Sequence, residues 1–157
     1  MEREEIWALV NQYCHLRDVQ YAAYELYARK NGLTAKELFV LDIIWFSPDG
    51  CLQSEICERL SATKQTVSAI IKKFWKLGYL SLTESKTDRR NKIIHFTDEG
   101  TAYTKKIVLP AVHAEIDAMA EFDLQGEDAA ELVRLTALFS DYMKKHFDAI
   151  ITESGGQ

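Results

Sequence analysis

The chain has 157 residues, of which 47% are hydrophobic and 27% charged. This balance is ordinary for a globular protein and excludes a disordered chain, and at roughly 100–200 residues per domain we expect one domain, or one domain with a helical extension. No run approaches the about 18 apolar residues of a membrane-spanning helix, and the first residues are not typical of a signal peptide. The three cysteines are an odd number and lack the C-x2-C spacing of a structural zinc site, so we expect the reducing environment of the cytoplasm.

The formal net charge is −5, but the charge is distributed unevenly. Between Ala62 and Phe96, eight lysine and arginine residues stand against two acidic ones, so the rest of the chain is strongly acidic. A compact basic segment inside an acidic protein is typical of a protein that places one face against phosphates. A solvated charged face is the alternative interpretation.

The first part of the chain predicts two helices. Apolar residues in 4–30 fall mostly three or four positions apart without an intervening Gly or Pro, which predicts a long amphipathic helix. Asn31 and Gly32 predict its end. Thr34, with Glu37 three residues later, has the pattern of a capping box at the start of a second helix, which we expect to run to about Phe46.

Two further helices follow the turn residues 47–50. We expect a short helix over 53–60 and a longer one over 64–77, with Gly78 as a left-handed stop. The longer helix has an apolar face that should point inward, formed by Val67, Ile70, Ile71, Phe74 and Leu77.

The pattern then changes to β-branched and aromatic residues, which predicts strands over 79–83 and 93–97 joined by a polar tip. A helix from Asp98 should continue, kinked, through Pro110, and a last helix should cover about 128–150 before a flexible tail at 152–157. The predicted fold is mainly α with a small β-hairpin wing: a winged helix-turn-helix domain with helices from both termini.

The polar face of the helix over 64–77 points to DNA binding. A helix about 20 Å long fits the major groove, where polar side chains near its start reach base edges and lysines further along hold phosphates. The candidate DNA-binding residues on and around the two helices are Gln53, Ser54, Thr63, Lys64, Gln65, Thr66, Ser68, Lys72 and Lys73.

The hairpin tip adds the candidates Asp88, Arg89, Arg90 and Lys92. An arginine on a wing can enter a narrow minor groove, where the negative potential is concentrated, so we expect Arg89 there with Asp88 as its brace. Arg90 and Lys92 should hold flanking phosphates. A surface ion pair is the alternative role of Asp88, and it would contribute little to stability.

These motifs resemble the MarR family of transcription regulators. The resemblance runs from Leu33-Thr34 through Thr66-Val67-Ser68 and Leu77-Gly78-Tyr79-Leu80 to Asp88-Arg89-Arg90-Asn91-Lys92 and Thr97-Asp98-Glu99-Gly100. It implies a homodimer whose first and last helices interlock while its winged domains lie on a pseudo-palindromic operator. Residues 1–32 and 101–151 would then serve dimerisation, and residues 33–100 would bind double-stranded DNA.

The resemblance also implies an effector, a small phenolic or lipophilic molecule held between the dimerisation and DNA-binding regions. The candidate lining residues combine aromatic rings with cationic groups: Tyr13, Arg17, Tyr21, Tyr24, Trp45, Phe46 and His113. Aromatic residues at helical spacing are also typical of a helix core, and for each of them singly core packing is the favoured interpretation.

Two sensing chemistries are alternatives. Residues around Cys14 are faintly similar to the motif of peroxide-sensing members, but no nearby run of lysines would activate the thiol, so we expect Cys14 to be buried and inert. A metal sensor would need clustered ligands, and no two of His15, His95, His113 and His146 have the i, i+4 spacing of a ligand pair.

We therefore expect a sequence-specific DNA-binding repressor that a small molecule releases from its operator, with no cofactor and no catalytic activity. A redox- or metal-sensing regulator of the same fold is one alternative. A winged-helix protein-interaction subunit is another, but it should carry apolar rather than basic residues on the outward helix face. Neither a cysteine–histidine pairing nor a Gly-rich phosphate loop indicates an enzyme.

Overall fold

The computed structural model describes residues 1–84, 92–123 and 126–154. The chain divides into two compact units, Met1–Ala111 and Val112–Gln157, which we call the winged unit and the C-terminal unit. Among the described residues, no helix is long and apolar enough to cross a membrane.

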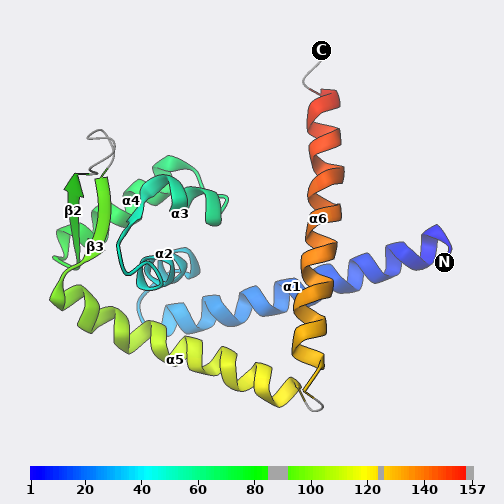
Figure 1. Ribbon diagram of the computed structural model, residues 1–157, viewed down its shortest axis with the longest axis horizontal. Helices are drawn as coiled ribbons and strands as arrows, with labels where there is room; N and C mark the ends of the chain where they lie inside the picture. Colours follow the sequence, from blue (N-terminus) through cyan, green and yellow to red (C-terminus); the bar gives the residue numbers. More distant parts are fainter. Residues whose placement is uncertain (85–91, 124–125, 155–157) are drawn as a thin grey trace. The chain divides into compact units, whose positions relative to one another are not determined.

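The winged unit combines helices with a small sheet, as the sequence predicts (Figure 1). Its helices are α1 (Arg3–Lys30), α2 (Ala35–Trp45), α3 (Gln53–Arg59), α4 (Lys64–Lys76) and the first part of α5 (Asp98–Phe122). Most bounds lie within one or two residues of the expected ones, because caps and glycines mark them in the sequence.

Local signals end α1 and start α2. Gly32 has φ +72°, and the Leu33 N–H donates to the Ala28 carbonyl oxygen at 2.9 Å, which closes the last turn of α1. The Thr34 hydroxyl accepts from the Glu37 N–H at 3.2 Å, and the Glu37 carboxylate accepts from the Thr34 N–H at 3.0 Å. The predicted capping box is therefore confirmed.

Three strands of the described chain form an antiparallel sheet in the order β1-β3-β2. The hairpin strands are β2 (Leu80–Glu84) and β3 (Lys92–Phe96), close to the expected ranges. Strand β1 (Cys51–Leu52), where Cys51 pairs with Ile94, was not predicted from the sequence. Two residues are too few to show the alternation that marks a strand.

The core of the winged unit is formed by α2, α3, α4, the first part of α5 and the sheet. Its largest fully buried apolar side chains are Phe74, Leu41, Ile56, Ile94, Val40, Val67 and Val108. One expectation is wrong: Leu77 is 54% exposed, because it is the C-cap of α4 and lies beyond the last turn that packs inward.

Thr97 fixes the junction between the sheet and α5. Its hydroxyl donates to the Gly78 carbonyl oxygen at 2.6 Å and accepts from the Gly100 N–H at 3.0 Å, and its own N–H donates to the Tyr79 carbonyl oxygen at 3.1 Å. The Thr97 hydroxyl thus caps α5 while it holds the chain that leaves Gly78 in a left-handed turn, at φ +76°.

Helix α5 continues through Pro110, as expected, and the boundary between the two units falls directly after this residue, at Ala111. The second helix of the C-terminal unit is α6 (Asp128–Ser154), and the Asp123 carboxylate accepts from the Asp128 N–H at 3.0 Å just before it. Residues 152–154, which we expected to lie in a tail over 152–157, form the end of α6, because no Gly or Pro interrupts the helix between Asp128 and Ser154.

Candidate nucleic-acid interface

The turn between α3 and α4 is held by side chains that the sequence analysis assigned to DNA. The Thr63 hydroxyl accepts from the Thr66 N–H at 3.2 Å, and the two hydroxyl oxygens of these residues are 2.9 Å apart. The Gln53 side-chain amide donates to the Lys64 carbonyl oxygen at 3.0 Å. Gln53, Thr63 and Thr66 therefore fix the start of α4 relative to α3.

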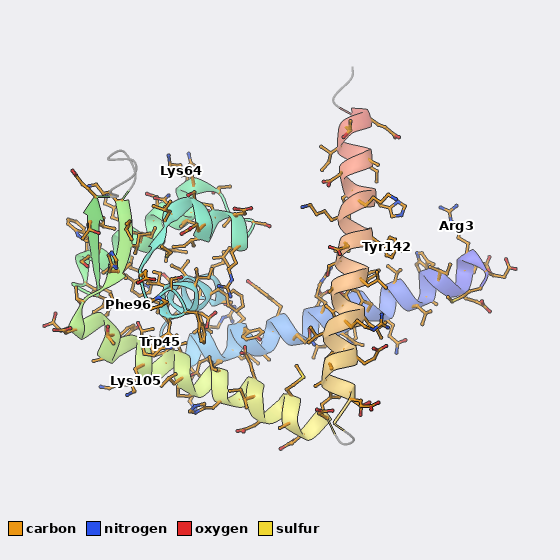
Figure 2. All side chains as sticks on the ribbon, viewed as in Figure 1. Arg3, Trp45, Lys64, Phe96, Lys105 and Tyr142 are labelled. Carbon is orange, nitrogen blue, oxygen red and sulfur yellow. The ribbon has the colours of Figure 1, made fainter. Side chains whose placement is uncertain are left out.

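Helix α4 separates apolar from polar side chains. Val67, Ile70, Ile71 and Phe74 are buried. The opposite face is exposed and carries Lys64, Gln65, Ser68 and Lys72. Figure 2 shows the Lys64 side chain extending away from the ribbon at the start of the helix. This is the face that the sequence analysis expected.

A groove of about 650 Å³ lies between α3, α4 and the sheet. Its lining residues are Leu52, Gln53, Ser54, Cys57, Lys64, Ser68, Ile71, Lys72, Trp75, Leu82, Lys92 and Ile94. Three are lysines and none of these described residues is acidic, so the lining of the groove carries a net positive charge. The structure thus brings Lys92 of β3 to the same groove as Lys64 and Lys72 of α4.

Two apolar residues of this groove, Trp75 and Leu82, were not predicted from the sequence. Trp75 is 52% exposed although tryptophan is largely buried in most proteins. Its spacing of seven from Ser68 and three from Lys72 places it on the same helix face, and this spacing was the signal that could have found it.

Lys73 has an acidic partner on another helix. Its Nζ lies 2.7 Å from Oε1 of Glu37 on α2. Burial works against the charged form of Glu37, but hydrogen bonds from Lys73 and Thr34 outweigh it, so the pKa of the carboxyl lies below its ordinary value.

Part of the candidate effector set is engaged inside the winged unit. Tyr21 and Tyr24 lie 6.4 and 5.1 Å, between ring centroids, from Phe39 of α2. The Arg17 guanidinium pairs with Asp18 at 3.0 Å, which raises its pKa.

At the end of α2, Trp45 lies 6.4 Å from Phe96, again between ring centroids, and lines a depression of about 320 Å³ (Figure 2). Phe46 is exposed, Tyr13 lies on α1, and His113 belongs to the C-terminal unit. A pocket formed by the whole candidate set stays a prediction.

The groups that redox or metal sensing would use do not form a cluster among the described residues. Cys14 is half-buried rather than buried as expected, because the described neighbours leave most of the surface of α1 exposed. Cys51 is the buried thiol, and burial raises its pKa to about 11. Within the described ranges, no three His, Cys, Asp or Glu side chains are grouped to hold a metal ion.

The wing candidates Asp88, Arg89 and Arg90 lie outside the described residues.

Part of the chain is similar in sequence to known transcription regulators. Residues 31–91 match the model of the MarR family. The HTH-type transcriptional regulator PapX of Escherichia coli is 33% identical over 79 residues, which are 50% of this chain and 48% of PapX. A second regulator of Escherichia coli, PrsX, is 32% identical over the same length. The chain thus spans about half the length of the curated relatives it matches.

Solved structures extend the likeness over most of the chain. AbsC, a MarR family transcriptional regulator from Streptomyces coelicolor, superposes with a TM-score of 0.73 at 18% identity, over 92% of this chain and 97% of AbsC. FabT of Streptococcus pneumoniae, solved in complex with DNA, has a TM-score of 0.68 at 20% identity, over 88% and 98% of the two chains. At such identities the likeness shows the fold. Residues 31–91 thus resemble the MarR family, and the chain has the fold of AbsC and FabT.

Proposed function

We propose that the protein is a sequence-specific DNA-binding transcriptional repressor that acts as a homodimer and leaves its operator when a small phenolic or lipophilic effector binds. The observation that carries the proposal is the convergence of Lys64, Lys72 and Lys92 on one groove, beside the exposed polar face of α4. PapX is a transcriptional regulator and FabT was solved in complex with DNA, and both similarities support the same role.

The contacts divide by chemistry. In this proposal Gln65 and Ser68, at exposed positions of α4, contact base edges, whereas Lys64, Lys72 and Lys92 hold phosphates. Arg89 enters the minor groove and Arg90 holds a flanking phosphate, as the family resemblance implies. Ser54, exposed at the start of α3, contacts the DNA backbone.

The homodimer is supported by exposed apolar side chains on two long helices. In α6 these side chains recur at helical spacing: Leu132, Leu135, Leu138, Tyr142, Met143 and Phe147. In α1 a similar set includes Ile6, Leu9, Val10 and Leu16. Long helices with an exposed apolar stripe are stable when a partner covers it, and a second copy of the chain supplies matching stripes.

The DNA test uses a random-sequence duplex library. Rounds of selection with the full-length protein should enrich a pseudo-palindromic sequence, and fluorescence anisotropy on that duplex should give an affinity that falls steeply with salt. Failure to enrich any sequence, together with salt-independent binding, would contradict the proposal. Light scattering should give a mass twice 18.0 kDa, and a stable monomer at micromolar concentration would contradict the dimer.

A further inference from the structure

Lys73 follows Lys72 in the sequence, but the two side chains lie on different faces of α4. Lys72 lines the groove with Lys64 and Ser68, at steps of four residues. Lys73 is turned about 100° from it and pairs instead with Glu37 of α2. Adjacent lysines of one helix thus have different surroundings.

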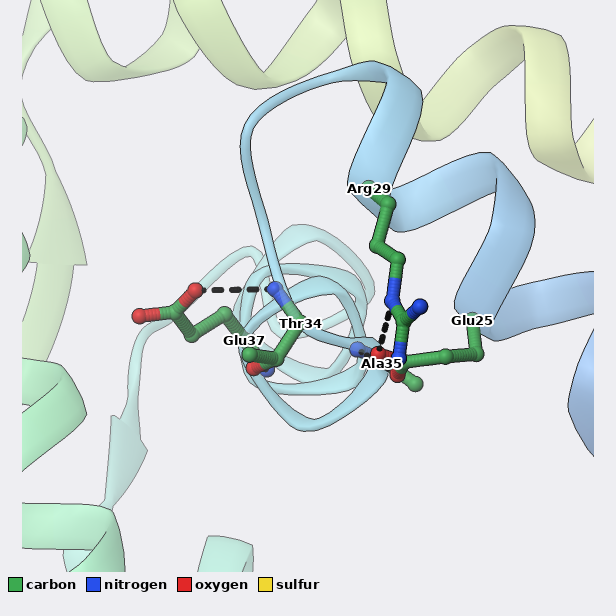
Figure 3. A network of polar contacts seen from close by, with 5 residues as sticks. All are labelled: Glu25, Arg29, Thr34, Ala35 and Glu37. Carbon is green, nitrogen blue, oxygen red and sulfur yellow. Dashed lines mark hydrogen bonds and ion pairs between the residues drawn. The ribbon is translucent and has the colours of Figure 1, made fainter.

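The partner of Lys73 is part of a larger polar network at the start of α2 (Figure 3). Glu25 of α1 accepts from the Ala35 N–H and from the Arg29 guanidinium, both at 2.9 Å. Glu37 accepts from the Thr34 N–H at 3.0 Å. Two carboxylates therefore satisfy N–H groups of the first turn of α2, where negative charge is favoured by the helix dipole.

This network joins three helices through the start of α2. Glu25 connects α1 to α2, and the Glu37–Lys73 pair connects α2 to α4. The Glu37 side chain is only 13% exposed. If Lys73 turned to a phosphate, it would leave this carboxylate without its cation, and an unpaired carboxylate in such a site is costly.

We propose that Lys73 is a positioning residue, which holds α4 on the start of α2 through Glu37 and does not bind DNA phosphate. The inference rests on the proposed function, since it assigns a role within DNA recognition. Because Lys73 sets the orientation of α4, its loss affects the fit of α4 to a specific sequence more than the general attraction to DNA.

The test compares Lys73→Met with the matched control Lys72→Met on the selected duplex and on a scrambled duplex, from low to high salt. Lys72→Met should weaken both duplexes alike and lower the salt slope by roughly one. Lys73→Met should leave the slope unchanged and lower the preference for the selected duplex by about five- to tenfold. Lys73→Arg, which keeps the pair with Glu37, should restore that preference.

Glu37→Gln separates the two roles. If Lys73 positions α4, then Glu37→Gln loses the same preference as Lys73→Met, and the double variant loses no more than either single one. If Lys73 holds a phosphate, then Glu37→Gln frees the lysine, tightens binding to both duplexes and steepens the salt slope. That result, or a slope lowered by one in Lys73→Met, would overturn the inference.

Hydrogen exchange in the DNA-free protein distinguishes failure of this inference from failure of the proposed function. Amides of α4 should exchange faster in Lys73→Met and Glu37→Gln than in Lys72→Met or the wild type. A wild type that binds no DNA but shows this exchange pattern would refute DNA recognition and retain the positioning of α4. Equal exchange in all four proteins would overturn the positioning itself.

Discussion

Gly100 packs directly against the backbone of Tyr79, so closely that the position of a Cβ atom on Gly100 falls on the Tyr79 carbonyl group. The contact lies at the junction that Thr97 holds together, where α5 leaves the sheet. A glycine is required here by the neighbouring chain and not by its own φ angle, which explains the last position of the Thr97-x-x-Gly100 motif.

Gly100→Ala should therefore destabilise the protein by about 3 kcal/mol, because backbone cannot move aside as a flexible side chain can. Gly78→Ala is the matched control: Gly78 has φ +76° but open space around its Cβ position, so only backbone strain of about 1 kcal/mol is expected. Urea unfolding of both variants measures the difference. A Gly100→Ala protein as stable as the wild type would contradict the close contact.

Gln65→Ala should relax sequence preference. If Gln65 contacts a base edge, the selected duplex loses about 1–3 kcal/mol of binding while a scrambled duplex is nearly unaffected. The salt slope should not change, because glutamine carries no charge. Anisotropy on the two duplexes checks this, and an equal loss on both would place Gln65 away from the bases.

Arg89→Ala should lose most affinity on operators with A·T-rich flanks and less on G·C-rich ones, because the narrow minor groove of A·T-rich DNA concentrates negative potential. Asp88→Ala should give a weaker version of the same defect, since it frees the arginine without removing a DNA contact. Paired duplexes that differ only in their flanks measure the effect, and thermal melts confirm folding. Unchanged binding by Arg89→Ala would leave DNA recognition to α4 and Lys92.

The Cys51 thiol should react slowly in the folded protein. Its pKa is raised to about 11 from 9.0, first by burial, so at pH 8 it carries about 100-fold less thiolate than an unfolded cysteine. In a Cys14→Ser background, a thiol reagent should modify half-buried Cys57 first and Cys51 only on unfolding. Cys51→Ser should remove the slow phase, and a single fast phase from two thiols would refute this order.

The capping carboxylates should make stability sensitive to acid. The pKa values of Glu25 and Glu37 lie below the ordinary 4.5, so their contribution is complete above that pH and is lost as the pH falls through the lower folded values. The lysine partner of Glu37 is 42% exposed, so solvent weakens the pair, and we expect Glu37 to contribute about 1 kcal/mol to the free energy of unfolding. Glu37→Gln should show a shallower acid decline in melting temperature than the wild type, and parallel curves would contradict this role.

Features that depend on residues close together in the sequence were predictable. The capping box is visible as Thr34 and Glu37 three residues apart, and the left-handed position of Gly78 is visible as a glycine that follows an apolar run. The structure confirms both. The exposed face of α4 follows from helical periodicity alone, which is why Lys64 and Lys72 were correctly predicted to lie on it.

Features that depend on distant residues were not predictable. The Lys73 and Glu37 pair joins two helices, and nothing near Lys73 in the sequence distinguishes it from Lys72. Cys51 becomes a strand residue only because Ile94 lies opposite it. Leu77 continues the apolar period of α4 yet lies past its last turn, so periodicity alone gave the wrong side.

The pairing of β1 with β3 also sets an order of folding. Leu82 and Ile94 are close in the sequence, so their pairing closes a short loop. Cys51 and Ile94 are separated in the sequence by α3, α4 and β2, so their pairing closes a much longer loop. Longer loops cost more entropy to close, and contacts between distant residues form slowly. The hairpin should therefore close before β1 joins it, so the wing and the helix-turn-helix acquire their fixed relation only after the hairpin has formed.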